Sequence, residues 1–132
     1  MTTSVADTGF LLTLEFPPDA NTKAKIERLV QEELAGRLLI PVIVLTEFVK
    51  VAGSRIGLDA ALTRIRILKS RGAKIIPVDE ELALVAGKLL LSHPTLPMPD
   101  ALVASVVHAR KAEYVLSNDS HFKAIGVKSR WI

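Results

Sequence analysis

Short runs of β-prone residues alternate along this chain with longer segments of helical periodicity, and this alternation most constrains the fold. The β-prone runs are Val5-Ala6, Leu38–Ile40, Lys74–Val78, Tyr114–Leu116 and Val127–Ile132. Between the first two, apolar residues recur at helical spacing in Ile26, Leu29, Val30 and Leu34. Strands that alternate with helices form a parallel sheet that is covered by helices on both faces. The sequence therefore predicts an α/β fold with such a sheet.

Two further segments show the helical period, from Leu58 to Leu68 and from Leu82 to Leu90. Asp79 is a candidate N-cap of the second of these helices. The segments Phe16–Asp19 and Ser92–Pro99 are rich in proline and predict loops. The sequence has no internal repeat and no linker, and its 132 residues suit one core. We therefore expect a single domain over residues 1–132.

Composition excludes several classes of protein. A hydrophobic content of 49% argues against disorder, and the absence of cysteine excludes disulfides, thiolate ligands and a thiol nucleophile. The first residues lack the basic and apolar regions of a signal peptide, and the apolar runs are shorter than the ~20 residues of a membrane helix. We expect a cytoplasmic protein that does not enter a membrane. A net charge of +3 favours a polyanionic partner.

Four acidic residues lie where an apolar run ends or a helix begins: Asp7, Glu47, Asp100 and Asp119. Ligands of an open parallel sheet gather beyond the carboxyl ends of its strands. Asp7 follows the first predicted strand and Asp119 follows the fourth, so both should reach that region. Asp100 at a helix start and Glu47 early in a helix can reach it as well. Carboxylates are seldom buried without a partner, and a divalent cation would neutralise their repulsion.

An all-oxygen set of ligands suits the hard cations Mg²⁺ and Mn²⁺. A metal ion held by carboxylates can orient water, lower the pKa of that water and stabilise charge that builds on a phosphate. The four acids therefore favour phosphodiester hydrolysis.

Four motifs in this order resemble those of the PIN-domain nucleases, in particular the single-domain VapC-like toxins of toxin–antitoxin pairs. The motifs are Val5–Leu12, Leu45–Phe48, Pro97–Ala104 and Val115–Phe122. The resemblance spans essentially the whole chain. It implies a PIN-like fold and an endoribonuclease that depends on Mg²⁺ or Mn²⁺ and cleaves RNA.

In this resemblance, the catalytic residues are Asp7, Glu47, Asp100 and Asp119, and the metal ligands are the three aspartates. Thr8 and Ser117 match positions where the family places a hydroxyl near the metal. The resemblance also implies a VapB-like antitoxin as partner and a homodimer. His121 is a departure, because many relatives carry a further aspartate at this place.

Structural roles are open for the same residues. Asp7, Asp100 and Asp119 could each be a helix cap or strand-end cap, whereas Glu47 lies inside an apolar helix and suits that explanation least. Thr8 could continue the turn at Asp7, and Ser117 could simply end a strand. His121 could bind metal or substrate, or be a bystander; His93 and His108 suit ordinary surface roles.

Surface residues allow two interpretations as well. The basic residues of one helix and its approach could guide RNA or form a solvated face: Lys50, Arg55, Arg64, Arg66, Lys69 and Arg71. Aromatic residues are few, so the sequence shows no obvious platform on which bases could stack. Leu84, Leu91 and Ile67 lie beside the core stripes of their helices and could form the seam of a dimer.

Rival functions remain for such a fold. A phosphatase would need a second aspartate two residues after Asp7, where this chain has Gly9, and a phospho-receiver would need an adjacent acidic pair. A PIN-domain nuclease that processes RNA outside a toxin–antitoxin pair would share all four motifs. A catalytically silent interaction protein would have no use for clustered carboxylates, which destabilise a fold.

Overall fold

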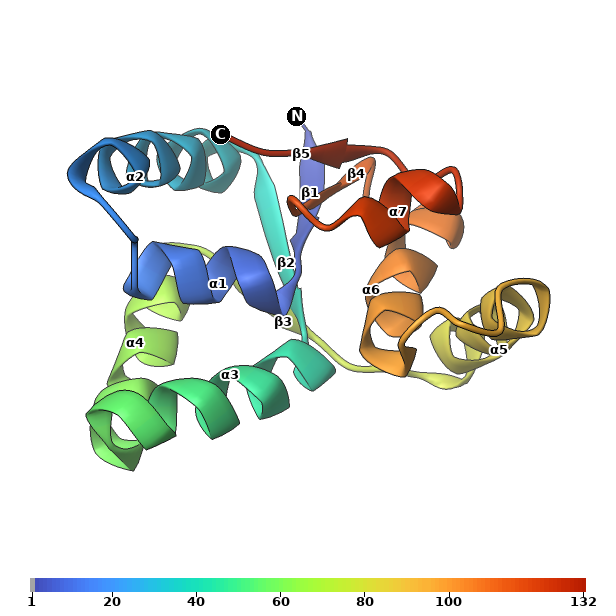
Figure 1. Ribbon diagram of the computed structural model, residues 1–132, viewed down its shortest axis with the longest axis horizontal. Coiled ribbons are helices and arrows are strands. Elements are labelled where there is room, and N and C mark those ends of the chain that lie inside the picture. Colours follow the sequence, from blue (N-terminus) through green and yellow to red (C-terminus); the bar gives the residue numbers. More distant parts are fainter. Residues whose placement is uncertain (1) are drawn as a thin grey trace.

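All five predicted strands are present in the computed structural model, which describes residues 2–132, and they pair in parallel in one sheet (Figure 1). The strands are β1 (Thr3–Ala6), β2 (Arg37–Pro41), β3 (Lys74–Ile76), β4 (Tyr114–Leu116) and β5 (Ser129–Arg130). The helices are α1 (Thr8–Glu15), α2 (Ala20–Ala35), α3 (Val42–Ile56), α4 (Leu58–Ser70), α5 (Glu80–Ser92), α6 (Met98–His108) and α7 (Ser120–Ala124).

The strand order is β3-β2-β1-β4-β5, so β1 lies at the centre of the sheet. The chain builds outwards from β1 to β2 and β3, and it then returns to the other side of β1 to add β4 and β5. The order of strands therefore reverses between β1 and β4. In open α/β sheets, this switch point is where ligands bind, at the carboxyl ends of the strands.

Helices cover both faces of the sheet, as the sequence predicted. Figure 1 shows α1, α2, α3 and α4 on one side of the strands, and α5 and α6 on the other. The central strands are buried on both faces, with Val5, Ala6, Val115 and Leu116 all inaccessible to solvent. Such uninterrupted apolar runs are typical of parallel strands between two helical layers.

Local sequence signals explain where the elements begin and end. The Asp79 side chain accepts a hydrogen bond from the Leu82 N–H at 2.9 Å, which confirms Asp79 as the N-cap of α5. Pro77 follows β3 directly and cannot donate to a neighbouring strand, so β3 is shorter than the predicted run Lys74–Val78. Gly57 has a φ of 89° and separates α3 from α4, a conformation that few other residues adopt easily.

The last strand is also shorter than predicted, and side chains make up for its few backbone contacts. Only Ser129 and Arg130 of the predicted run form β5. Arg130 donates to the Oε1 atom of Glu33 on α2 at 2.7 Å and to Glu32 at 2.6 Å. The Tyr114 hydroxyl of β4 donates to the same Glu33 oxygen at 2.6 Å. A buried carboxylate on α2 therefore ties β4 and β5 to the helical layer.

The part of the chain that the structure describes contains no helix with both the length and the apolar character needed to cross a bilayer.

We predict that Arg130→Ala lowers the free energy of unfolding by about 2 kcal/mol. Loss of one partner from a buried ion pair costs about 3–5 kcal/mol, and the Tyr114 hydroxyl still donates to Glu33 in the variant. Glu32→Ala is the matched control: its carboxylate is about half exposed, so its loss should cost less than about 1 kcal/mol. Urea unfolding of the three proteins measures both effects, and equal midpoints for the two variants would contradict the prediction.

Candidate metal centre

All four acidic residues identified in the sequence line one small hollow at the carboxyl edge of the sheet. The hollow has a volume of about 190 Å³. Its lining consists of Asp7, Thr8, Gly9, Glu47, Pro99, Asp100, Val103, Asn118 and Asp119. These residues come from the end of β1, from α1, α3 and α6, and from the residues just before α7, which meet at the switch point between β1 and β4. The predicted convergence of the acids is therefore present.

Asp7 follows β1 and is the most deeply buried of the four acids, with 7% of its surface exposed. It is the N-cap of α1, and its Oδ1 atom accepts a hydrogen bond from the Phe10 N–H at 2.8 Å. A hydrogen bond with the Ser117 side chain also reaches its carboxylate. The cap that the sequence allowed is real, and the same carboxylate lines the hollow.

Asp100 lies inside the first turn of α6 and does not cap it. Pro97 occupies the N-cap position, and no side chain caps this helix. The capping role that the sequence allowed for Asp100 is therefore wrong. Its carboxylate does not bind the helix backbone as a cap and lines the hollow, where the helix dipole favours a negative charge.

Asp119 caps the short helix α7 and accepts a hydrogen bond from the His121 N–H at 2.9 Å. Its own N–H donates to the Ser117 hydroxyl oxygen at 2.9 Å. Ser117, which is buried at the end of β4, thus contacts two acids of the site. The Ser117 side chain therefore links the chain after β1 to the chain after β4.

Glu47 projects from α3, and the Thr8 hydroxyl donates a hydrogen bond to its Oε1 atom. Thr8 is the first residue of α1, so this contact joins two helices across the hollow. Of the two hydroxyl residues named from the sequence, Ser117 forms hydrogen bonds with Asp7 and Asp119, and Thr8 forms one with Glu47.

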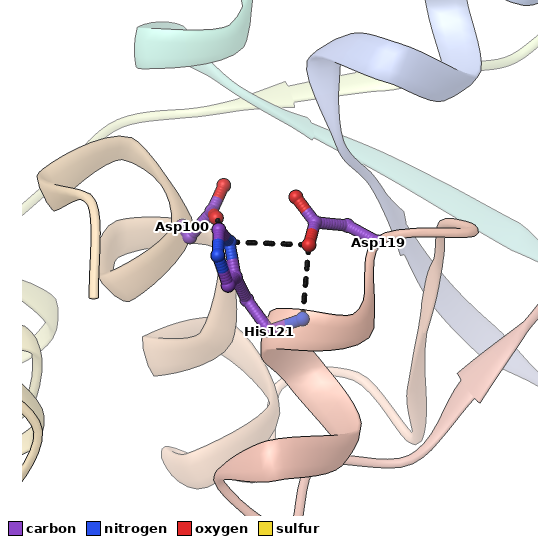
Figure 2. Close-up of side chains that lie close together, drawn as sticks. All are labelled: Asp100, Asp119 and His121. Carbon is purple, nitrogen blue, oxygen red and sulfur yellow. Dashed lines mark hydrogen bonds and ion pairs between the residues drawn. The ribbon is translucent and has the colours of Figure 1, made fainter. Parts of the chain in front are cut away.

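His121 contacts two of the acids, as Figure 2 shows. Its Nδ1 atom lies 2.7 Å from Oδ2 of Asp100 and 3.1 Å from Oδ1 of Asp119. One ligand atom from each of the three residues lies within 4.8 Å of the other two. The side chain of His121 is about half exposed, and His121 is not part of the lining of the hollow. His93 and His108 do not belong to the cluster.

Burial of the aspartates and repulsion among them raise the free energy of the folded protein when these side chains are charged. Burial raises the pKa of Asp7 from 3.8 to about 6, against the hydrogen bonds from Ser117 and Phe10, and repulsion from the other two aspartates adds to the rise. Burial likewise raises the pKa of Asp100, although the hydrogen bond from His121 acts in the opposite direction. The hydrogen bond to Asp100 raises the pKa of His121, and the charge of Asp119 adds to it.

The donor set fits a divalent cation. Asp7, Asp100 and Asp119 line the same hollow, and a cation there would offset the repulsion that adds to the raised pKa of Asp7. The close cluster of possible ligand atoms consists of Asp100, Asp119 and His121, and Asp7 does not belong to it. Carboxylate oxygens are the ligands that Mg²⁺ and Mn²⁺ take in proteins.

Asn118 also lines the hollow but was not singled out in the sequence, although its place beside Asp119 after a strand was a usable signal. A second hollow of about 310 Å³ shares Asn118 and Asp119 with the first. Its further lining includes Lys123 and Trp131. The acidic site therefore continues into a surface that carries a positive charge and an aromatic ring.

The basic helix α4 does not contribute to either of these hollows. Arg64 and Arg71 line a different one, together with residues of α1 and α2, and Arg64 pairs with Glu15 at 3.4 Å. The Arg55 guanidinium stacks on the Phe16 ring at 4.3 Å. For these arginines the structure favours local roles over guidance of a ligand to the acids.

We predict that Asp7→Asn stabilises the metal-free protein at neutral pH by roughly 2–3 kcal/mol. Because the pKa of Asp7 is higher in the folded than in the unfolded chain, the folded state binds more protons between about pH 4 and pH 6. Its contribution to stability therefore falls as the pH rises through this window, and asparagine, an equally good N-cap, avoids that loss.

Urea unfolding in EDTA at several pH values tests this prediction, and the gap between variant and wild type should close near pH 4. Asp19→Asn is the matched control, because Asp19 caps α2 in the same way but is exposed. A variant no more stable than wild type at neutral pH would show that Asp7 carries no such cost.

Solved structures of similar fold include VapBC2 from Rickettsia felis bound to a DNA fragment from its promoter, with 18% sequence identity, coverage of 98% of each chain and a TM-score of 0.79. VapC20 from Mycobacterium tuberculosis, a Sarcin–Ricin loop cleaving toxin, is 22% identical, with coverage of 94% of this chain and 95% of that chain and a TM-score of 0.77. DNA-bound VapBC from Salmonella typhimurium is 20% identical, with coverage of 99% and 98% and a TM-score of 0.76. These TM-scores show a shared fold.

No curated protein matches this sequence significantly. The sequence pattern of the PIN domain matches residues 5–128, which include all four acids of the hollow. Because this match spans most of the chain, and the four acids it includes meet at the switch point of the sheet, this chain belongs to the PIN-domain family.

Proposed function

We propose that this protein is an endoribonuclease that depends on a divalent metal, hydrolyses phosphodiester bonds of RNA and acts as the toxin of a VapBC-type toxin–antitoxin pair. The observation that carries this proposal is the convergence of four carboxylates on one hollow at the switch point. Membership of the PIN family supports the reaction class. One structural neighbour is a Sarcin–Ricin loop cleaving toxin, which supports a toxin that cleaves RNA.

In the proposed site, Asp7, Asp100 and Asp119 hold Mg²⁺ or Mn²⁺, and Glu47 completes the catalytic quartet. The bound ion supplies positive charge that lowers the pKa of an attacking water and stabilises the negative charge of the phosphate. Ser117 fixes the orientation of two aspartates through its hydroxyl. Thr8 fixes one oxygen of Glu47, which leaves the other oxygen to accept a hydrogen bond from water in the hollow.

The adjoining hollow supplies a route for the RNA strand. Lys123 can attract a phosphate next to the acids, whose own charge repels it, and Trp131 offers an aromatic surface for a base. Ser120 and Ser129 add hydroxyl groups to the same lining. A strand that passes through this hollow would present the neighbouring phosphodiester to the carboxylates.

We predict that the purified protein cleaves RNA with Mg²⁺ or Mn²⁺ and that EDTA abolishes the cleavage. Asp7→Asn, Asp100→Asn and Glu47→Gln should each lower the rate by about 100-fold or more, because each removes a charge that positions the ion or the water. Labelled RNA resolved on a gel measures the rates.

Asp19→Asn is again the control, since it makes the same change at an exposed cap and should leave cleavage unchanged. Circular dichroism of each variant separates loss of activity from loss of fold. Cleavage that persists in EDTA, or normal cleavage by all three site variants, would refute the nuclease assignment.

The proposed partner is a small VapB-like antitoxin that covers the acidic hollow. Structural neighbours of this chain include VapBC complexes and a toxin–antitoxin complex from Klebsiella pneumoniae. Such a partner can place an arginine or lysine against the carboxylates and so replace the charge of the metal. A PIN-domain nuclease that processes RNA outside such a pair would need no partner of this kind.

We predict that expression of the chain alone arrests growth and that Asp7→Asn relieves the arrest. Co-expression of the product of a small gene immediately upstream should restore growth, and the two proteins should copurify. Colony counts and size-exclusion chromatography measure these outcomes. A chain that is harmless when expressed, and that is recovered from its source only as a free monomer, would contradict the toxin assignment.

The proposal includes a homodimer. Leu84 and Leu91 lie two turns apart on α5 and are 61% and 84% exposed, and Met98 at the start of α6 is 64% exposed. Apolar side chains that share a helix face and remain exposed favour an interface. Ile67 does not belong to this face, because it lies on α4 on the other side of the sheet, where it lines the hollow with Arg64 and Arg71 (Figure 1).

A further inference from the structure

His121 is the one residue of the cluster with Asp100 and Asp119 that is not an acid. Its imidazole Nδ1 atom contacts oxygens of Asp100, in α6, and of Asp119, the N-cap of α7. The backbone N–H of His121 also binds Asp119, at 2.9 Å. The side chain is therefore held against both acids from the start of α7.

We propose that His121 is itself a metal ligand, so that this centre is a mixed nitrogen–oxygen site that prefers Mn²⁺ to Mg²⁺. This inference rests on the metal centre of the proposed function and adds to it the identity of a ligand and of the favoured ion. Asp100 and Asp119 supply the oxygens on either side of the nitrogen.

The spacing of the three donor atoms suits one ion. Neighbouring ligands of an octahedral ion with bonds of about 2.1 Å lie roughly 3 Å apart. The imidazole nitrogen of His121 lies 2.7 Å and 3.1 Å from the two oxygens, and all three atoms are within 4.8 Å of one another. The side chain of His121 is also the most exposed of the three, so it can adjust when an ion enters.

The chemistry of the nitrogen sets the preference among ions. Mg²⁺ demands oxygen ligands and gives up water reluctantly. Imidazole is a softer ligand that divalent first-row transition metals accept, and Mn²⁺ is the weakest binder of that series. An aspartate at position 121 would offer a third hard oxygen and would remove this discrimination. The histidine therefore shifts the site away from Mg²⁺ and towards Mn²⁺.

His121 could have a different role, with the same contacts to the two aspartates but no bond between its nitrogen and the metal. His121 could only donate a hydrogen bond that positions Asp100 and Asp119, while oxygens alone hold the ion. The two roles differ in one observable property, the presence of nitrogen in the coordination shell of the bound ion. A spectroscopic measurement on the bound ion therefore separates them.

The experiment loads the purified chain with Mn²⁺ at mildly alkaline pH and records pulsed electron paramagnetic resonance, in which a coordinated imidazole modulates the signal of the ion. Four proteins are compared: wild type, His121→Ala, His121→Asp and His108→Ala. His108 lies two turns along α6 from Asp100, is exposed, and is outside the cluster, so its variant is the matched control. We expect the nitrogen signal in wild type and His108→Ala, and its loss in both variants of His121.

Calorimetric titration of the same proteins with each ion provides the affinities. Loss of a group that merely supports a ligand already weakens metal binding by about 10- to 100-fold, so His121→Ala should bind Mn²⁺ at least about tenfold more weakly. His121→Asp should bind Mg²⁺ more tightly than wild type, so that its preference for Mn²⁺ falls.

The outcomes separate this inference from the proposed function. Mn²⁺ bound without a nitrogen signal in wild type, or equal ion preference in wild type and His121→Asp, overturns the role of His121 and leaves the metal centre intact. Wild type that binds neither ion would overturn the metal centre, and with it both proposals.

Discussion

The parallel pairing of β1 with both β2 and β4 is the constraint on which the candidate site depends. It places the switch point of the sheet beside the carboxyl end of β1, so the residues that follow β1 and β4 must meet. Asp7 and Asp119 occupy those two places. The helices that pack on either face then bring Glu47 and Asp100 to the same hollow. Because the hydrogen-bond pattern of the backbone sets this arrangement, it does not require that the acids attract one another.

The acids in fact repel one another, and the fold compensates locally. Asp7 and Asp119 each accept a hydrogen bond from a backbone N–H at a helix start, and Ser117 contacts both. These contacts lower the cost of the charges but do not remove it, since the pKa of Asp7 remains near 6. Residues that weaken a fold while clustering in a hollow are typical of sites under functional constraint.

The sequence predicted those features that depend on local pattern. The strands, the parallel sheet and the cap at Asp79 follow from periodicity and from residues that end helices or strands. The convergence of the four acids follows from the topology that this pattern implies. The capping alternative for Asp100 was wrong because the N-cap of α6 is Pro97, three residues earlier, and spacing in the sequence does not fix the first residue of a helix.

Features that depend on distance in space could not be predicted in this way. The contact of His121 with Asp100 joins residues on two helices, and only their packing brings them together. The pairing of Arg64 with Glu15 likewise joins residues on two helices, and nothing in the sequence pattern indicates it. Ile67 resembled Leu84 and Leu91 in sequence, but the sheet separates their helices (Figure 1). Which side chains pair, and which face of the sheet a helix covers, depend on how the helices and the sheet pack together.

The buried anchor at Glu33 has a consequence for how the molecule opens. The segment from β4 to β5 contains Asp119 and His121, and β5 contributes only two residues to the sheet. Few backbone hydrogen bonds hold that strand, so the bonds from Arg130 to α2 set much of the free energy of its detachment. Release of β5 would remove one support of the segment that carries Asp119 and His121, and Phe122 in the core would remain the other. The amides of β5 should therefore exchange faster than those of the central strands, and their exchange would measure how often this side of the site opens.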